Sequence, residues 1–199
     1  NPLLDPARRS PETQLVHGGT HRTEFNETSE ALFLNSGYSY PSSDHAERLF
    51  KGEIPGAHNY SRFANPTVDV LQTRMALLEG AEAARGFATG MAAVTDAVMS
   101  QVRAGDHIVA SRALFGGCRF VVEDFMPRYG VSSTLVDGRD PANFAAAMQP
   151  NTKVVFIETP TNPSLELVDI QAVADIAHAH GAVLIVDNVF ATALYQKPL

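Results

Sequence analysis

The sequence predicts an α/β fold, with a mostly parallel sheet, helices on both of its faces and an extended arm before it. Two continuous apolar runs, 154–157 and 183–186, are typical of strands buried on both faces of a parallel sheet. Between them, apolar residues recur at helical spacing from Ile170 to Ala177, and the pattern ends at Gly181. A strand, a helix and a second strand in this order indicate a crossover unit of such a sheet.

The first 60 residues differ from the rest of the chain. They are rich in Ser, Thr, Asn, Gly, Pro and Tyr and carry little hydrophobic periodicity, so we expect one short helix, near 44–50. Such a segment buries too little apolar surface to form its own core. We therefore expect residues 1–60 to form an arm that lies on another surface, such as a neighbouring subunit, and residues 61–199 to begin the globular domain.

Local signals place the remaining elements. Asn65 suits a helix N-cap, Pro66 the first helical position and Gly80 the helix end. The further elements predicted in chain order are a short apolar strand at 84–88, a helix from 89 to about 103, a strand at 107–110, a helix from about 116 to 129, a strand at 132–136 and a helix at 141–148.

Composition excludes several classes of protein. The chain has 199 residues and a formal net charge of −7, which disfavours nucleic-acid binding because that requires a basic surface. No apolar run approaches the roughly 20 residues of a membrane span, and the first ten residues lack the apolar core of a signal peptide. The single cysteine, Cys118, allows no intrachain disulfide, so we expect a cytoplasmic protein. The histidines show no metal-ligand spacing, and we expect no metal site.

Polar residues follow three of the predicted strands, where ligands bind in parallel sheets. At Thr89-Gly90-Met91, small residues at a strand-to-helix turn let backbone N–H groups approach an anion. A phosphate site and a plain tight turn both explain this pattern. After 154–157, Pro160 and Pro163 fix the shape of a loop that carries Asn162. Such a loop can present the Asn162 amide for a directional hydrogen bond, and a simple proline-rich connection explains the pattern equally well.

The third strand is followed by Asp187. A carboxylate at the end of a buried strand needs a partner, which can be a protonated ring nitrogen, a metal ion or a helix terminus. Before the first predicted helix of the domain, Arg62 suits bidentate contact with a phosphate, and Tyr60 suits hydrogen bonding or acid–base chemistry. A surface turn is the alternative for these two. Cys118 lies beside two glycines with nothing near it in sequence to activate it, so we expect a small semi-buried residue rather than a nucleophile.

The order of these segments is far more specific than any one of them. Tyr60-Ser61-Arg62, 65–67, 89–93, 158–163 and 186–192 follow one another in a way that resembles the Cys/Met-metabolism family of pyridoxal 5′-phosphate (PLP) enzymes. That family includes cystathionine γ-synthase, cystathionine γ-lyase, methionine γ-lyase and the homoserine-ester sulfhydrylases, and the resemblance runs from about Thr13 to the last residue. Three further stretches, 29–38, 111–118 and 187–192, look most like its O-succinylhomoserine sulfhydrylase branch.

The resemblance implies the fold type I architecture of these PLP enzymes and roles for individual residues. Asp187 is expected to pair with the pyridine nitrogen of PLP, and the backbone N–H groups of Gly90 and Met91 to bind its phosphate. Asn162 is expected near the phenolic oxygen of the cofactor. Phe115 takes the position of the aromatic ring that stacks on PLP. Relatives often have Tyr at this position, so any role of the Tyr hydroxyl group is absent here.

The resemblance also implies a shared active site. Tyr60 and Arg62 are expected to reach the phosphate of a neighbouring subunit's PLP within a homotetramer, with Tyr60 also aiding proton transfer. The implied reaction is γ-replacement, in which sulfide displaces the succinyl group of O-succinylhomoserine and gives homocysteine. The cofactor-binding lysine and the arginine for the substrate carboxylate are expected beyond Leu199.

Several alternatives stay open. Cystathionine γ-synthase and the γ-lyases share the cofactor frame and differ in the nucleophile or the fate of the product. A dinucleotide-binding module would need a G-x-G-x-x-G turn, which 89–93 lacks. A non-catalytic scaffold derived from the family would lack the lysine.

Overall fold

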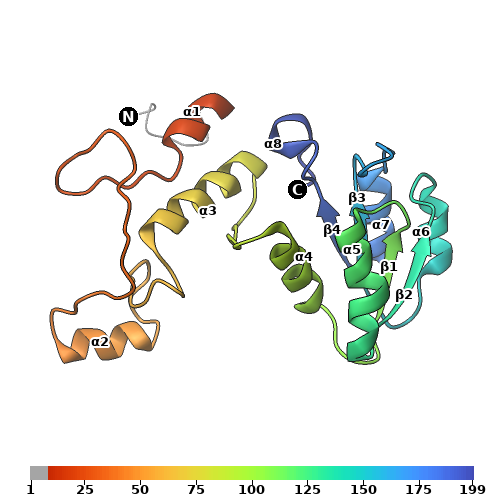
Figure 1. Ribbon diagram of the computed structural model, residues 1–199, viewed down its shortest axis with the longest axis horizontal. Coiled ribbons are helices and arrows are strands. Elements are labelled where there is room, and N and C mark those ends of the chain that lie inside the picture. The colour runs from red at the N-terminus through yellow and green to blue at the C-terminus, as the bar shows by residue number, and fades with distance from the viewer. Residues whose placement is uncertain (1–8) are drawn as a thin grey trace. The chain divides into compact units, whose positions relative to one another are not determined.

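The structure, a computed structural model, describes residues 9–199 (Figure 1). It contains two compact units, and the division falls between Gly86 and Phe87. The part of the predicted arm in residues 1–8 lies outside the described residues. The first unit includes the helix after Asn65 as well as the arm, while the assignment of residues 1–60 to a neighbouring subunit's surface stays a prediction.

The first unit contains three helices in its described part, α1 (Pro11–His17), α2 (Ser43–Phe50) and α3 (Pro66–Glu79). The predicted caps of α3 are confirmed, since the Asn65 side chain accepts the Thr67 N–H at 2.9 Å and Gly80 adopts φ 75°. Helix α2 is confirmed as well, whereas α1 was not predicted. Leu49 is the one buried hydrophobic side chain that residues 9–60 contribute, as expected of a segment without its own core.

The second unit holds the sheet. Its strands are β1 (His107–Ser111), β2 (Ser132–Val136), β3 (Thr152–Glu158) and β4 (Val183–Asp187), and its longer helices are α4 (Gly90–Met99), α6 (Pro141–Ala147) and α7 (Ile170–Ala179). The strand order is β2-β1-β3-β4 with every pairing parallel, so the predicted parallel sheet is confirmed. Strands β3 and β4 pair in register, which places Glu158 opposite Asp187 at their carboxyl ends.

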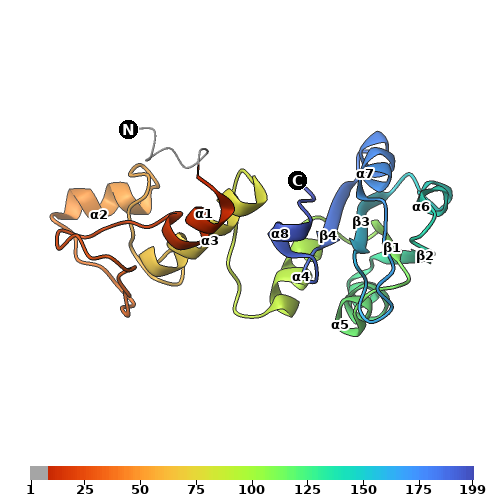
Figure 2. The ribbon, with the colours of Figure 1, turned by 90° about the horizontal axis from the view of Figure 1, so that it is seen from above.

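Helices cover both faces of the sheet, as predicted. Alternate residues of the strands enter two separate cores, because successive side chains of a strand point to opposite faces. Ile108 and Phe156 pack with α5 (Gly116–Phe120) and the turns after it, whereas Val109 and Val155 pack with α6 and α7. Figure 2 shows α5 on one side of the strands and α6 and α7 on the other.

Three local predictions are corrected by the structure. Residues 84–88 form no strand, since the Gly86 N–H donates to the Gln72 side chain at 2.9 Å instead of to a neighbouring strand. The helix predicted from 116 to 129 is an α-helical turn, α5, followed by a π turn, η3 (Val121–Phe125), and a 3₁₀ turn, η4 (Met126–Tyr129), because Pro127 has no N–H to continue the ladder. Strand β4 lies at a sheet edge and is only half-buried, with Val183 44% exposed.

Among the helices of residues 9–199, none combines the length and apolar character needed to cross a membrane.

Candidate active site

A pocket of about 700 Å³ lies at the carboxyl ends of β3 and β4 and at the start of α4. Five of the predicted site residues line it together: Gly90, Met91, Phe115, Asn162 and Asp187. They come from four segments that are distant in the sequence, and the parallel sheet brings these segments to one edge. The volume is in the range of small-molecule sites.

The start of α4 offers free backbone donors. Thr89 caps this ten-residue helix by accepting the Ala92 N–H at 3.1 Å. Gly90 and Met91 occupy the first helical positions, where an N–H has no partner within the helix. Apart from the neighbouring residues and the backbone of α4 itself, no described atom lies within 4 Å of the position that a Cβ on Gly90 would take, so the space beside this turn is open. Two free N–H groups at a helix N-terminus suit a phosphate.

Asp187 ends β4 and presents a carboxylate to the same pocket. Its Oδ1 accepts the Val189 N–H at 3.1 Å, and the Cys118 thiol donates to Oδ2 at 3.6 Å. Burial and then the nearby Asp187 carboxylate raise the pKa of Cys118 to about 12, so the thiol stays protonated and acts as a donor. No cation pairs with Asp187 among residues 9–199, which leaves its negative charge available to a positively charged ligand group.

Phe115 and Asn162 are held by one buried carboxylate. Glu158, the last residue of β3, accepts the backbone N–H of Phe115 through Oε2 and that of Asn162 through Oε1 at 2.9 Å. The Phe115 side chain stays 46% exposed at the pocket wall, free to stack on a flat ligand. The pKa of Glu158 is raised, chiefly by burial, while the two N–H donors oppose the shift.

Tyr60 and Arg62 belong to the first unit and are not among the lining residues of this pocket. The Arg62 guanidinium carbon lies 5.2 Å from the centre of the Tyr60 ring and 5.1 Å from that of Phe63. Both predicted residues are exposed, and no carboxylate among residues 9–199 forms an ion pair with Arg62. The structure thus brings these two residues together and leaves the cation accessible.

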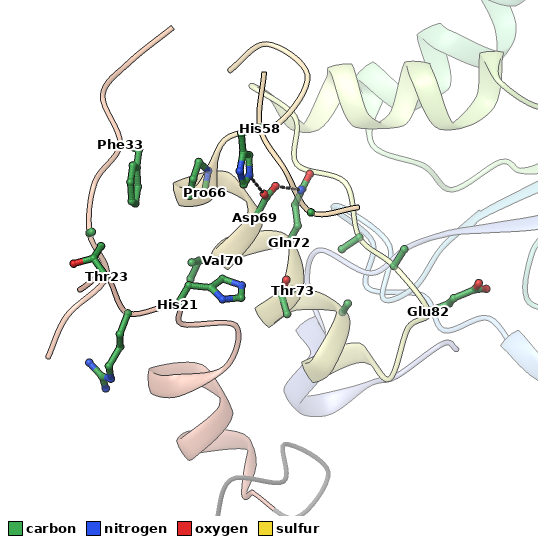
Figure 3. A pocket seen from close by; sticks show the side chains of 16 residues that line it. His21, Thr23, Phe33, His58, Pro66, Asp69, Val70, Gln72, Thr73 and Glu82 are labelled. Carbon is green, nitrogen blue, oxygen red and sulfur yellow. Dashed lines mark hydrogen bonds and ion pairs between the residues drawn. The ribbon is translucent and has the colours of Figure 1, made fainter. Parts of the chain in front are cut away.

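The first unit has a cavity of its own, also of about 700 Å³, which contains none of the predicted site residues. In its lining, the His58 ring bonds to Asp69 at 2.6 Å, and Gln72 donates to the other oxygen of the same carboxylate at 3.3 Å (Figure 3). These polar groups satisfy one another, as in a structural cluster. We assign no ligand to this cavity.

Two further residues of the pocket, Glu158 and Cys118, bond to predicted site residues although no role in the site was predicted for them. For Glu158 a signal was present, because it follows an apolar run in the sequence in the same way as Asp187. For Cys118 the expectation of a small buried residue is confirmed, at 1% exposure, but its bond to Asp187 joins positions 69 residues apart and has no local signal. Among the described residues, no three His, Cys, Asp or Glu side chains gather into a possible metal site.

The donor set of the pocket fits PLP. Free N–H groups match a phosphate, an unpaired carboxylate matches a protonated ring nitrogen, and an exposed aromatic face matches a planar ring. Each of these groups reaches the pocket from a different segment, so that they can contact the phosphate, the ring nitrogen and the ring face of one cofactor.

Comparison with known proteins points the same way. The family described as Cys/Met metabolism PLP-dependent enzyme matches residues 12–199. The O-succinylhomoserine sulfhydrylase of Mycobacterium tuberculosis (strain H37Rv) is 48% identical over 98% of this chain and 48% of its own length. The L-methionine gamma-lyase of Porphyromonas gingivalis is 40% identical over 94% of this chain and 47% of its own length.

A solved structure, metY from Campylobacter jejuni, has a TM-score of 0.91 at 30% identity over 96% of this chain and 47% of that one, and it contains N′-pyridoxyl-lysine-5′-monophosphate. The chain spans about half the length of the curated relatives that it matches. The family match covers both units, from α1 to the last residue. This chain belongs to the Cys/Met metabolism PLP-dependent enzymes.

Proposed function

We propose that this chain forms part of an O-succinylhomoserine sulfhydrylase, which makes homocysteine from O-succinylhomoserine and sulfide. The observation that carries the proposal is the meeting of five predicted cofactor residues at one pocket. The choice within the family rests on the comparisons, since identity is 48% with a sulfhydrylase and 40% with a methionine gamma-lyase.

When bound, PLP supplies an electron sink that stabilises negative charge developing on an amino-acid substrate. In our proposal the N–H groups of Gly90 and Met91 bind its phosphate, and Asp187 keeps a proton on its ring nitrogen. Phe115 excludes water from one face of the ring, and the Asn162 amide donates to its phenolic oxygen. The thiol of Cys118 adds a hydrogen bond that orients the Asp187 carboxylate.

The exposed pair Tyr60 and Arg62 is proposed to reach the phosphate in a neighbouring subunit, where Tyr60 also helps to move a proton. The apolar surface of the arm supports this arrangement. Phe25 is 83% exposed and Leu34 is 92% exposed, as expected of side chains that a partner covers. A homotetramer and a cytoplasmic location belong to the same proposal, as do the cofactor-binding lysine and the substrate-carboxylate arginine in the part of the protein that follows Leu199.

The direct test incubates the full-length protein with PLP and O-succinylhomoserine, offers sulfide and cysteine together, and identifies the products by mass spectrometry. We expect mainly homocysteine. Mainly cystathionine would assign the protein to the γ-synthase branch, and a keto acid formed in place of both products, although sulfide and cysteine are present, would assign it to the γ-lyases. Absence of both product and bound PLP would leave the non-catalytic scaffold as the explanation.

A further inference from the structure

Glu158 is a buried carboxylate with an unusual set of partners. It is 1% exposed, and no ion pair among residues 9–199 includes it. A buried charge without a cation is costly unless hydrogen bonds compensate for the lost water. Both of its oxygens accept backbone N–H groups, one from each of two separate segments.

The first segment is the turn between β1 and α5. Phe115 is the N-cap of α5, and its own side chain cannot cap the helix. The carboxylate of Glu158 accepts the N–H of this residue, so the backbone that carries the aromatic ring is held by a side chain from β3.

The second segment is the loop after β3. Its Asn162 N–H donates to the other oxygen of Glu158 at 2.9 Å. The backbone that carries the Asn162 side-chain amide, which we propose to contact PLP, is therefore held by the same carboxylate as the backbone that carries the stacking ring. Both residues line the pocket with Asp187, which is the register partner of Glu158 on β4.

We propose that Glu158 is a positioning residue of the active site, whose carboxylate sets the Phe115 ring and the Asn162 amide relative to each other for cofactor binding. This inference rests on the proposed PLP site. Glu158 acts through the backbone of two segments, and the groups that contact the cofactor are the residues it holds. The two bonds require two acceptor oxygens, because each N–H uses a different one.

The test compares Glu158→Gln with Glu166→Gln in the full-length protein. Gln keeps the size of Glu but has one acceptor oxygen, so it retains at most one of the two bonds. Glu166 provides the matched control, since it lies on the same loop and its carboxylate faces Arg139 at 3.8 Å. Hydrogen exchange of the PLP-free protein and visible circular dichroism of the PLP-loaded protein are measured for both variants.

For Glu158→Gln we expect roughly tenfold faster exchange in the segments around Phe115 and Asn162, since a hydrogen bond to a charged group is lost. We expect a PLP dissociation constant roughly tenfold higher and a weaker dichroism band of the bound cofactor. Glu166→Gln should match the wild type in all three measurements. Glu158→Asp keeps the charge but has a shorter reach, and an intermediate effect is expected.

Unchanged exchange in both segments, or an unchanged dichroism band with unchanged PLP affinity, would overturn the positioning role. If Glu158→Gln fails to fold, the Asp variant decides by the same measurements, and wild-type values there would overturn the proposal. The outcome is independent of the reaction catalysed. If the protein forms homocysteine and Glu158→Gln has no effect, only the positioning role is refuted. If Glu158→Gln speeds hydrogen exchange and weakens PLP binding but the protein forms no homocysteine, the positioning role is supported and only the sulfhydrylase assignment is refuted.

Discussion

Replacing Asp187 by Asn removes a negative charge from the pocket, together with the one acceptor oxygen to which the Cys118 thiol donates. The amide oxygen of Asn can still accept the Val189 N–H that Asp187 accepts at 3.1 Å, so the turn after β4 keeps its bond. We therefore expect the free energy of unfolding to change by less than about 1 kcal/mol. The proposed partner of the lost charge, a protonated ring nitrogen, is present only when PLP is bound.

The cost to PLP binding follows from the burial of Asp187. A hydrogen bond to a charged group contributes about 1.5–3 kcal/mol, and breaking a buried pair costs about 3–5 kcal/mol. Asp187 is half-buried, so we take about 3 kcal/mol, which corresponds to roughly a 100-fold higher dissociation constant. Turnover should fall by at least the same factor, because a neutral ring nitrogen weakens the electron sink.

The assay titrates the PLP-free full-length protein with PLP and follows cofactor absorbance, with thermal unfolding measured in parallel. Asp175→Asn is the matched control, because Asp175 is exposed on α7 and only accepts a bond from Gln171 at 2.9 Å. A PLP affinity and turnover within twofold of the wild type for Asp187→Asn would refute the assignment of Asp187 to the ring nitrogen.

Three further predictions concern Cys118, His107 and Arg62. Because the pKa of Cys118 is raised to about 12, its thiol should resist iodoacetamide at pH 8 in the folded protein and react after the protein is denatured. Fast labelling of the native protein would contradict the burial of this thiol. Burial lowers the pKa of His107 below 6.5, so the unfolded chain takes up the proton first, and the stability advantage of the wild type over His107→Gln should shrink as the pH falls below 6.5. A difference in unfolding free energy that does not vary with pH would show that His107 does not titrate in this way. Arg62→Ala should raise the PLP dissociation constant roughly tenfold and leave the monomer fold intact, because the exposed guanidinium stacks only on neighbouring rings. Unchanged affinity would argue against contact with a neighbouring subunit's cofactor.

The elements that the sequence predicts well carry their signals within a few residues. The helix from Pro66 to Glu79 has its cap, its proline and its terminal glycine in the chain itself. Strand β3 is buried on both faces, and a short continuous run of apolar residues in the sequence is enough to reveal it. Helix α1 has comparable signals in Ser10 and Pro11, but it is short and lies in a segment that otherwise lacks helical periodicity, so it was not predicted.

The features that were missed depend on distant partners. Residues 84–88 have the apolar character of a strand, yet a strand forms only where another backbone pairs with it, and the Gly86 N–H finds the Gln72 side chain instead. The role of Glu158 needs the turn at Phe115, which lies 43 positions earlier in the chain. Sequence order therefore predicted which residues reach the pocket but not what holds them there.

The most direct test of the PLP site is an experimental structure of the full-length protein with PLP bound. Our account predicts that the ring nitrogen lies within hydrogen-bonding distance of the Asp187 carboxylate, with the phosphate at the N–H groups of Gly90 and Met91 and one face of the ring against Phe115. A cofactor bound elsewhere, or bound here with its ring nitrogen away from Asp187, would contradict the account.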